Sequence, residues 1–447
     1  MYSIARFFRA LHLPNRFFIA LGVAAVVTGL GFGVPMLFPI GQTMLALVAV
    51  LLFADVALLF RFESIVEGGR RLPKVLSLGD DNPVHLTLRS SHPLRLSATV
   101  IDELPMQFQR RNFALHTTLP PNENIVLHYP LRPTTRGGYG FGNVQVFCKT
   151  PLGMAVRCVT IAGAHEVPVY PSILQMKKFE LRAFARISTL DGIKKQRRLG
   201  HSYEFEQIKN YVRGDDYRSI NWKATSRHSE LMVNQYEDER AQQIYCIIDK
   251  SRVMRMPFAE LSLMDYAINT ALVISNIALK KHDRAGLITF SAGLGSAIKA
   301  ERKPDQLHTI LHALYKEREQ PQEANYELLY NAVSRLINGR SLLFLYTNFE
   351  SMYALERVLP LLRRINRMHL LVVVFFKNTE IATFAQTPAN TLEGVYEQTT
   401  AQKSVMEKTQ IVQKLRQFGI QAILTEPENL SLNTVNKYLE LKSRGFI

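Results

Sequence analysis

The sequence predicts a multidomain protein with an N-terminal transmembrane helical hairpin, a small β-sandwich and a doubly wound α/β domain. Three observations support this: two apolar runs near the N-terminus, short alternating strands in the middle, and apolar strands alternating with helices in the C-terminal half. A length of 447 residues suits about three domains of roughly 150 residues each. We expect a membrane anchor at 1–72, the β-sandwich at 73–171, a linker with a sequence motif at 172–240 and the α/β domain at 241–447.

Composition narrows the class of protein. Hydrophobic residues make up 47% and charged residues 21%, which is ordinary for folded domains and excludes a disordered chain. The three cysteines, Cys148, Cys158 and Cys246, form no CxxC pair. This excludes a disulfide-stapled secreted scaffold and a cysteine-rich zinc ribbon, and it fits a reducing compartment.

The membrane anchor rests on two apolar runs. Phe17–Val34 has 18 residues without a charge, and Thr43–Phe60 has 18 with a single acid. Each can just cross a hydrocarbon core of about 30 Å, and prolines and a glycine between them let two helices double back. A cleavable signal peptide is the alternative, but a second span follows at once and no small-residue cleavage site is evident.

Charge predicts the orientation of the anchor. The segment between the runs contains no lysine or arginine, whereas seven basic residues flank them: Arg6, Arg9, Arg16, Arg61, Arg70, Arg71 and Lys74. The positive-inside rule therefore predicts a two-pass protein of the cell inner membrane with cytoplasmic soluble domains. The net charge of +16 fits a basic body beside an anionic leaflet. The acid in the second run, Asp55, is expected to face the partner helix or to snorkel toward the interface; a functional intramembrane acid is the alternative.

The middle region alternates polar and apolar residues with the period of half-buried strands. The predicted strands are His85–Arg89, Leu94–Ile101, Asn124–Tyr129, Asn143–Val146 and Met154–Ile161. Gly138–Gly142 superficially resembles a dinucleotide-binding loop. It lies between strands and lacks the GxGxxG spacing, so we predict a glycine-rich hairpin there.

A basic stretch follows the predicted β-sandwich. Lys177–Arg198 contains eight lysines and arginines against Glu180 and Asp191. A solvated linker near the membrane or a docking surface for an acidic partner both fit this charge. Nucleic acid is not expected as a partner, because no reader motif or interleaved aromatic residue accompanies the basic charge.

The segment after the basic stretch carries a dense set of residue types. Phe205, Ile208 and Val212 have helical spacing, so Glu204–Val212 is predicted as a helix that ends at Arg213–Asp216. With the residues beyond it, this segment resembles the family called domain of unknown function 58. The resemblance rests on Glu204, Phe205, Tyr211, Gly214, Asp215, Asp216, Arg218, Ile220, Asn221, Trp222, Lys223, Ser226, Arg227, Leu231, Met232 and Val233.

Two interpretations of this motif stay open beside a catalytic one. Asp215, Asp216, Arg218 and Arg227 could form a hydrogen-bonded lattice that fixes a turn, since arginine forks suit carboxylates. The same residues could instead form a surface for a partner. Catalysis has less support, because the adjacent His201 and Ser202 do not by themselves place a base at a hydroxyl.

The remaining sequence predicts a parallel sheet covered by helices on both faces. Its expected strands are Ile244–Ile248, Gly286–Phe290, Leu342–Tyr346, His369–Phe376 and Gln421–Leu424. Its expected helices are Leu261–Leu279, Asp305–Lys316, Tyr326–Ile337, Met352–Ile365, Ala401–Phe418 and Leu432–Lys442. Ligands of such sheets gather beyond the carboxyl ends of the strands, where Asp249 and Asn348 fall.

The family resemblance implies a von Willebrand factor A-like fold for this domain. In such domains a strand-ending Asp-x-Ser-x-Ser, a threonine on a second loop and an aspartate on a third bind a divalent metal. Here Asp249 and Ser251 keep two positions, Val253 takes the third, the threonine is replaced near Asn325, and Asn348 replaces the aspartate. Because Mg²⁺ usually needs a carboxylate or two, we expect a degenerate site with weak Mg²⁺ binding or none, and no other cofactor.

Motifs of common enzymes are missing from the sequence. It contains no Walker A glycine-lysine pair, no HExxH helix and no GxSxG elbow. With the resemblance, this predicts a non-enzymatic membrane-anchored adaptor for a MoxR-type AAA+ ATPase. The alternatives are a hydrolase centred on the turn from Gly214 to Arg218 and a membrane-tethered nucleic-acid binder.

Overall fold

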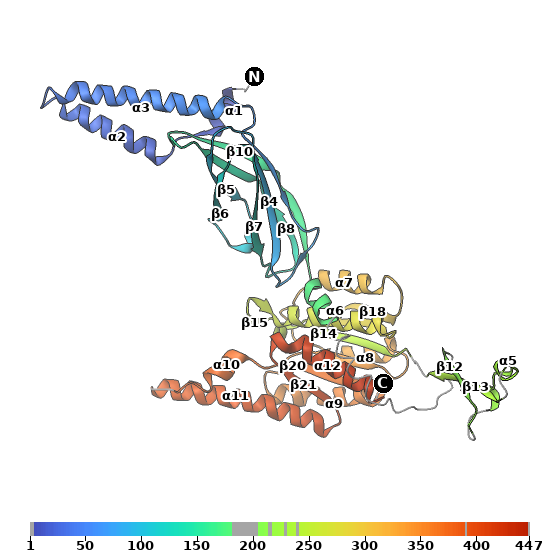
Figure 1. Ribbon diagram of the computed structural model, residues 1–447. Coiled ribbons are helices and arrows are strands. Elements are labelled where there is room, and N and C mark those ends of the chain that lie inside the picture. The colour runs from blue at the N-terminus through green and yellow to red at the C-terminus, as the bar shows by residue number, and fades with distance from the viewer. Residues whose placement is uncertain are drawn as a thin grey trace. The chain divides into compact units, whose positions relative to one another are not determined.

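The computed structural model of this chain describes residues 4–180, 204–212, 217–227, 230–237, 241–388 and 391–445 (Figure 1). The chain divides into two units, Met1–Ser172 and Ile173–Ile447. Most of the predicted basic stretch, and Gly214, Asp215 and Asp216 of the motif, lie outside the described residues.

An N-terminal helix pair opens the first unit, after the short helix α1 (Ile4–Ala10). Helices α2 (Asn15–Leu30) and α3 (Leu37–Phe60) approach so closely at Gly41 that a Cβ there would lie 2.7 Å from the Cα of Thr28. Among the described helices, α3 is the one that is long and apolar enough to cross a membrane, while α2 is apolar but has only 16 residues. The second predicted span is therefore longer than expected and the first is shorter.

Asp55 of α3 is bound by the β domain. It is fully buried, and its carboxylate accepts hydrogen bonds from the backbone N–H groups of Met154 (2.7 Å) and Ala155 (2.8 Å) and from the hydroxyl of Thr150. The expectation that Asp55 faces the partner helix or snorkels is wrong, because the loop after Lys149 supplies three donors that solvate the carboxylate.

The end of α3 is held by a second buried charge. Arg157 donates hydrogen bonds to the backbone carbonyls of Leu59 (2.8 Å), Phe62 (2.8 Å) and Glu63 (2.7 Å). The last carbonyls of a helix have no partner within the helix and carry a partial negative charge, so an arginine there satisfies both needs. Asp55 and Arg157 together fasten the last two turns of α3 to the β domain.

Three sheets form the β domain, which is β-sandwich-like as predicted. Their strand orders are β2-β4-β7, β1-β10-β9-β5-β6 and β3-β11-β8. The strands are β1 (Leu11–His12), β2 (Val66–Arg71), β3 (Leu76–Ser77), β4 (Asn82–Ser90), β5 (Leu96–Asp102), β6 (Ala114–Leu119), β7 (Asn124–Leu131), β8 (Gly137–Phe141), β9 (Val144–Lys149), β10 (Val156–Ala162) and β11 (His165–Tyr170). Alternate residues such as Val84, Leu86 and Leu88 are buried, which is the period-2 pattern that predicted these strands.

The predicted hairpin at Gly138–Gly142 is wrong. Gly138–Phe141 belong to strand β8, which pairs with β11, and Gly142 follows the strand; Tyr139 and Phe141 are buried. Glycines and aromatic residues alternate here, so the aromatic rings lie on the core side and the glycines on the other side. The segment is therefore a strand with the ordinary period of 2.

The predicted helix at Glu204–Val212 is also wrong. Residues Glu204–Asn210 form strand β12, which pairs antiparallel with β13 (Met232–Glu237). Pairing with a strand more than twenty residues away satisfies the backbone and overrides the local 3.6-residue spacing of apolar side chains. Strand β13 begins at Met232, one of the motif residues.

A mixed six-stranded sheet forms the core of the second unit, in the order β18-β17-β14-β19-β20-β21. Its strands are β14 (Gln243–Asp249), β17 (Arg284–Phe290), β18 (Leu294–Glu301), β19 (Leu342–Tyr346), β20 (Leu370–Phe376) and β21 (Gln421–Thr425). All neighbours are parallel except β18, which runs antiparallel to β17. The prediction of a wholly parallel sheet is wrong at this edge, where the turn after Phe290 makes a hairpin.

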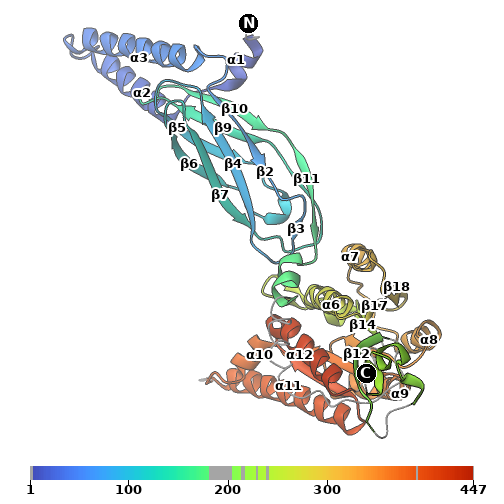
Figure 2. The same ribbon diagram turned by 45° about the vertical axis from the view of Figure 1, so that its right-hand side comes forward.

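Helices cover both faces of the sheet (Figure 2). One face packs against α6 (Leu263–Lys280), α7 (Gln306–Lys316) and α12 (Leu430–Ser443), and the other against α8 (Tyr326–Leu336), α9 (Met352–Met368) and α11 (Leu392–Gln417). Cys246 and Ile248 of β14 belong to the first core, and Tyr245 and Ile247 to the second. The helix before β21 begins nine residues earlier than predicted, and the short helix α10 (Thr379–Phe384) was not predicted.

Candidate functional site

Strands β14 and β19 end side by side, at the carboxyl edge of the sheet. The chain leaves β14 at Asp249 and leaves β19 just before Thr347. Asp249 is fully buried, and its carboxylate accepts hydrogen bonds from the backbone N–H of Ser251 (2.9 Å) and the hydroxyl of Thr347 (2.7 Å). The Thr347 hydroxyl also lies 2.9 Å from that of Tyr326.

Burial raises the pKa of both Asp249 and Tyr326. It raises the pKa of the Asp249 carboxyl above its ordinary value, although the hydrogen bonds from Ser251 and Thr347 lower it. Burial, followed by the nearby Asp249 charge, also raises the pKa of Tyr326. A carboxyl that holds its proton more tightly is a poorer metal ligand, because metal binding requires the deprotonated form.

The other positions of the implied metal site are already occupied by protein contacts. Asn348 donates to the carbonyl of Val253 (3.4 Å), and its amide oxygen accepts a hydrogen bond from the ammonium group of Lys408 (2.7 Å). Asn325 caps α8 by accepting from the N–H of Leu328 (3.0 Å). Among the described residues, no three or more His, Cys, Asp or Glu side chains gather as a metal site would require.

Lys408 and Ser251 decide what this edge can bind. Lys408 lies on α11, and burial lowers its pKa to about 8. Its ammonium group places a positive charge at the side-chain oxygen of Asn348, which would otherwise be available to a metal ion. The Ser251 hydroxyl is buried, and it has no hydrogen-bond partner in the described part of the chain. This edge therefore offers a metal ion one orphaned hydroxyl and one carboxyl whose pKa is raised by burial.

We expect Mg²⁺ titrated into the wild-type chain to give no heat of binding in calorimetry. The double variant Val253→Ser/Asn348→Asp should stay weak, because Lys408 would pair with the new carboxylate. Adding Lys408→Met should raise the Mg²⁺ affinity by at least about tenfold, since it frees that carboxylate. Micromolar binding by the wild type that is lost in Asp249→Ala would contradict this prediction.

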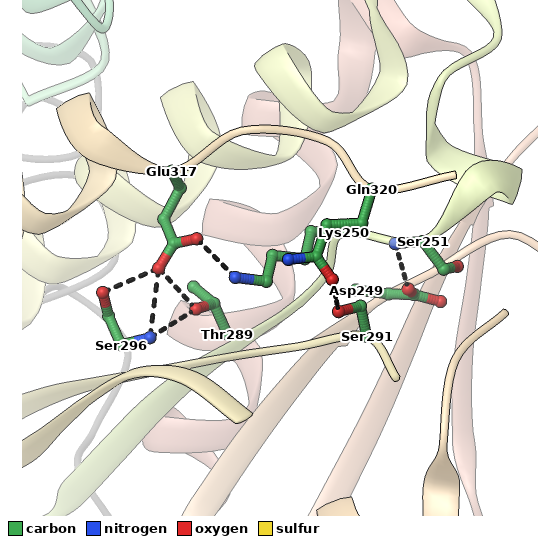
Figure 3. Close-up of polar contacts among 8 residues, drawn as sticks. All are labelled: Asp249, Lys250, Ser251, Thr289, Ser291, Ser296, Glu317 and Gln320. Atoms are coloured by element: carbon green, nitrogen blue, oxygen red, sulfur yellow. Dashed lines mark hydrogen bonds and ion pairs between the residues drawn. The ribbon is translucent and has the colours of Figure 1, made fainter. Parts of the chain in front are cut away.

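A second polar network lies beside Asp249 (Figure 3). The ammonium group of Lys250 lies 2.8 Å from a carboxylate oxygen of Glu317, and both side chains are buried. The other Glu317 oxygen accepts from the hydroxyl of Thr289 (2.7 Å) and from both the hydroxyl (2.7 Å) and the backbone N–H (3.0 Å) of Ser296. Burial acts to raise the pKa of Glu317, but the bonds from Lys250, Ser296 and Thr289 outweigh it and lower the pKa. Glu317 is therefore a stabilised carboxylate.

Gly295 and the segment after α7 leave room for the Lys250–Glu317 pair and its hydrogen bonds. A Cβ at Gly295 would lie 2.3 Å from the Thr289 hydroxyl and 2.5 Å from the Lys250 nitrogen, so only glycine fits. The N–H of Gln320 donates to the carbonyl of Lys250 (2.8 Å), and the Ser291 hydroxyl donates to the side chain of Gln320. These bonds tie the segment after α7 to the strand ends.

Sequence analysis missed this network entirely. Lys250 and Thr289 lie at or near the ends of predicted strands, and polar residues at strand ends were a signal that could have identified them. Nothing local marks Glu317, which directly follows α7 and reaches Lys250 across 67 residues of sequence.

The motif residues that can be described form a small module, the signature hairpin, made of β12, β13, the 3-10 turn Tyr217–Ser219 and α5 (Trp222–Thr225). Asn221 caps α5 by accepting from the N–H of Ala224 (2.9 Å) and donates to the side chain of Asn234 (2.8 Å). The N–H of Tyr211 donates to the carbonyl of Leu231 (2.7 Å). Asn221 thus has a structural role, and Glu204 and Phe205 lie in β12.

The other described motif residues lie at the surface of the signature hairpin. Tyr217 and Trp222 are each 69% exposed, and Val212 is exposed as well. The Arg218 guanidinium lies 5.7 Å from the ring centroid of Tyr217, which is a cation–π distance. Lys223 and Arg227 are exposed too. Asp215 and Asp216, the expected lattice partners of Arg218 and Arg227, lie outside the described residues, so the lattice and the partner-surface interpretations both stay open.

Comparisons with known sequences agree with the motif. A family described as "Protein of unknown function DUF58" matches residues 207–384. The uncharacterized protein YeaD of Bacillus subtilis (strain 168) is 26% identical over 208 residues, which cover 44% of this chain and 51% of that protein. This chain therefore spans about half the length of that relative.

Solved structures resemble parts of the chain only distantly. The CARDB domain of the PF1109 protein from Pyrococcus furiosus has 14% identity and a TM-score of 0.17, covering 23% of this chain and 86% of that one. The PKD domain of an M14-like peptidase from Thermoplasmatales archaeon SCGC AB-540-F20 has 13% identity and a TM-score of 0.16, covering 23% and 94%. At these TM-scores the similarity supports no argument about function.

Proposed function

Residues 207–384 of this chain are a domain of the DUF58 family, and on that basis we propose that the protein is a non-enzymatic, membrane-anchored adaptor for a MoxR-type AAA+ ATPase. One observation carries the proposal: the signature hairpin exposes Tyr217 and Trp222 beside the basic side chains of Arg218 and Lys223. Aromatic residues and arginine are the side chains that most often dominate protein–protein binding energy.

The carboxyl edge of the sheet supports a non-enzymatic role. Asp249 is buried and bonded to Ser251 and Thr347, and Glu317 is paired with Lys250. A general base needs a free lone pair within reach of a substrate proton, and these carboxylates lie under protein contacts. The order of the six strands, with helices on both faces, is consistent with a von Willebrand factor A-like domain whose metal site is degenerate.

Membrane anchoring is supported by the surface of the helix pair. Phe18 on α2, and Val50 and Phe53 on α3, are large apolar side chains that lie exposed. Contiguous exposed apolar surface is rare on soluble monomers. We propose that α2 and α3 form a two-pass hairpin in the inner membrane. By the positive-inside rule, the basic residues that flank the hairpin support a cytoplasmic location of the soluble domains, where an ATPase can reach them.

Recovery of the ATPase from detergent extracts tests the proposal. A tagged wild-type chain should co-purify a MoxR-type ATPase, and the double variant Tyr217→Ala/Trp222→Ala should recover at least about tenfold less, because interface aromatic anchors contribute about 2 kcal/mol or more each. Tyr353→Ala is the matched control, since Tyr353 is 78% exposed and lies on α9 outside the signature hairpin.

Two results would contradict the proposal. One is an unchanged ATPase yield from the double variant, and the other is an equal loss in Tyr353→Ala. Circular dichroism of each variant shows whether the chain remains folded.

A further inference from the structure

Helix α11 extends beyond the sheet that it covers. It has 26 residues and is about 39 Å long, whereas β20 has seven residues and spans about 23 Å. The C-terminal part of α11 buries Ile411, Val412 and Leu415 in the core. Its N-terminal part, Leu392–Ser404, lies beside α10 in both views of the fold (Figures 1 and 2), and we call α10 with this part the arm.

The arm is held together by polar contacts to one backbone carbonyl. The side chains of Gln398 (3.3 Å) and Gln402 (3.1 Å) both donate to the carbonyl of Ala385, directly after α10. The two helices therefore form a defined surface.

A pocket of about 430 Å³ lies between the two helices of the arm. Its lining is Ile381, Tyr396, Glu397, Thr400, Ala401 and Ser404. Apolar carbon and an aromatic ring make up most of the wall, and Glu397 is the one charged residue in the lining. This combination suits a side chain with an aliphatic stem and a cationic end.

The charge of the arm is opposite to that of the whole chain. Residues 379–404 carry Glu380, Glu393 and Glu397 against Lys403, although the chain as a whole carries +16. The arm also exposes large apolar side chains: Leu392 is 93% exposed and Tyr396 is 77% exposed. An acidic surface with exposed apolar residues is complementary to a basic, partly apolar polypeptide.

We propose that this pocket binds an arginine side chain of a partner polypeptide. The aliphatic stem packs against Ile381 and Ala401, the guanidinium lies over the Tyr396 ring, and it pairs with the Glu397 carboxylate. Neighbouring apolar residues of the partner cover Leu392. Five of the six lining residues lie on α11, after the last residue of the family match, and none belongs to the signature hairpin, so this inference does not rest on the identity of the ATPase.

Photo-cross-linking of a defined peptide to the full chain in detergent tests this inference. The probe is a short peptide, neutral apart from one arginine, with a benzoylphenylalanine beside that arginine, and its matched control carries citrulline, which has the shape of arginine without the charge. Mass spectrometry should map the adducts to residues 379–404. The citrulline peptide, and the protein variant Glu397→Gln, should each lower the yield by about fivefold or more.

Two further variants make the test specific. Glu407→Gln, on the same helix but outside the arm and the pocket lining, should leave the yield unchanged. Glu397→Arg should lower the cross-linking yield of the arginine peptide. It should raise the yield of the same peptide with glutamate in place of arginine, which a misfolded arm could not do. Equal yields from the arginine and citrulline peptides, or adducts mapped mainly outside the arm, would overturn the inference without affecting the proposed adaptor function.

Discussion

Glu317→Ala is expected to lower the free energy of unfolding of the α/β domain by about 3–5 kcal/mol, because it leaves the buried Lys250 ammonium without its counter-charge. It also removes the acceptor of Thr289 and Ser296. Hydrogen exchange of the detergent-solubilised chain, read at β14 and β17, measures the effect locally and does not require the whole chain to unfold in two states.

A matched variant distinguishes loss of the ion pair from loss of packing. Lys250→Met/Glu317→Leu removes both charges and keeps much of the volume, so it should recover most of the lost protection. Protection in Glu317→Ala equal to that of the wild type would show that water or rearrangement solvates Lys250.

The same network gives the α/β domain a pH dependence. The pKa of Glu317 is lower in the folded chain than its ordinary value, so the unfolded chain takes up a proton first as the pH falls. Its stabilising contribution is present above the unfolded pKa, about 4.3, and is lost as the pH falls through the folded pKa. Glu317→Gln should remove this part of the acid sensitivity.

Asp55→Leu is expected to destabilise the first unit by about 3–9 kcal/mol, since the N–H groups of Met154 and Ala155 and the hydroxyl of Thr150 lose their acceptor at about 1–3 kcal/mol each. Whether Asp55→Leu lowers or raises stability distinguishes a carboxylate bonded to the β domain from an acid that lies in lipid. For an acid that merely sits in lipid, exchange for leucine would favour the membrane helix by about 3 kcal/mol.

Thermal unfolding in detergent, with hydrogen exchange at the segment Thr150–Ala155, measures this change. Asp55→Asn is the control, because an amide oxygen can still accept from the two backbone N–H groups and should retain most of the stability. A more stable Asp55→Leu protein would contradict the contacts that Asp55 makes with the β domain.

Sequence patterns predicted elements well where burial is continuous or strictly periodic. The strand Leu342–Tyr346 was predicted with its observed bounds, and the ends of β14 and β19 were expected to meet. The predicted helix at Glu204–Val212 failed because a distant partner decides the local conformation there: β12 pairs with β13. Local spacing contains no information about such pairs.

The candidate site was predictable only in part for the same reason. Asp249 and Asn348 could be located because they follow apolar strands. The groups that decide their chemistry come from far along the chain, since Lys408 lies 60 residues after Asn348 and Thr347 lies 98 residues after Asp249. A single sequence does not indicate which distant lysine will reach a given amide oxygen.

The fastening of α3 to the β domain has a mechanical consequence in a bilayer. Arg157 bonds the carbonyl of Leu59 in the last turn of α3 and those of Phe62 and Glu63 just after the helix, while Asp55 holds the loop at Met154; these contacts restrain rotation and bending at the end of α3. Helices tilt to match the thickness of the lipid around them. With α3 in a bilayer as proposed above, a tilt imposed on α3 by a thinner or thicker bilayer would lean the β domain with it.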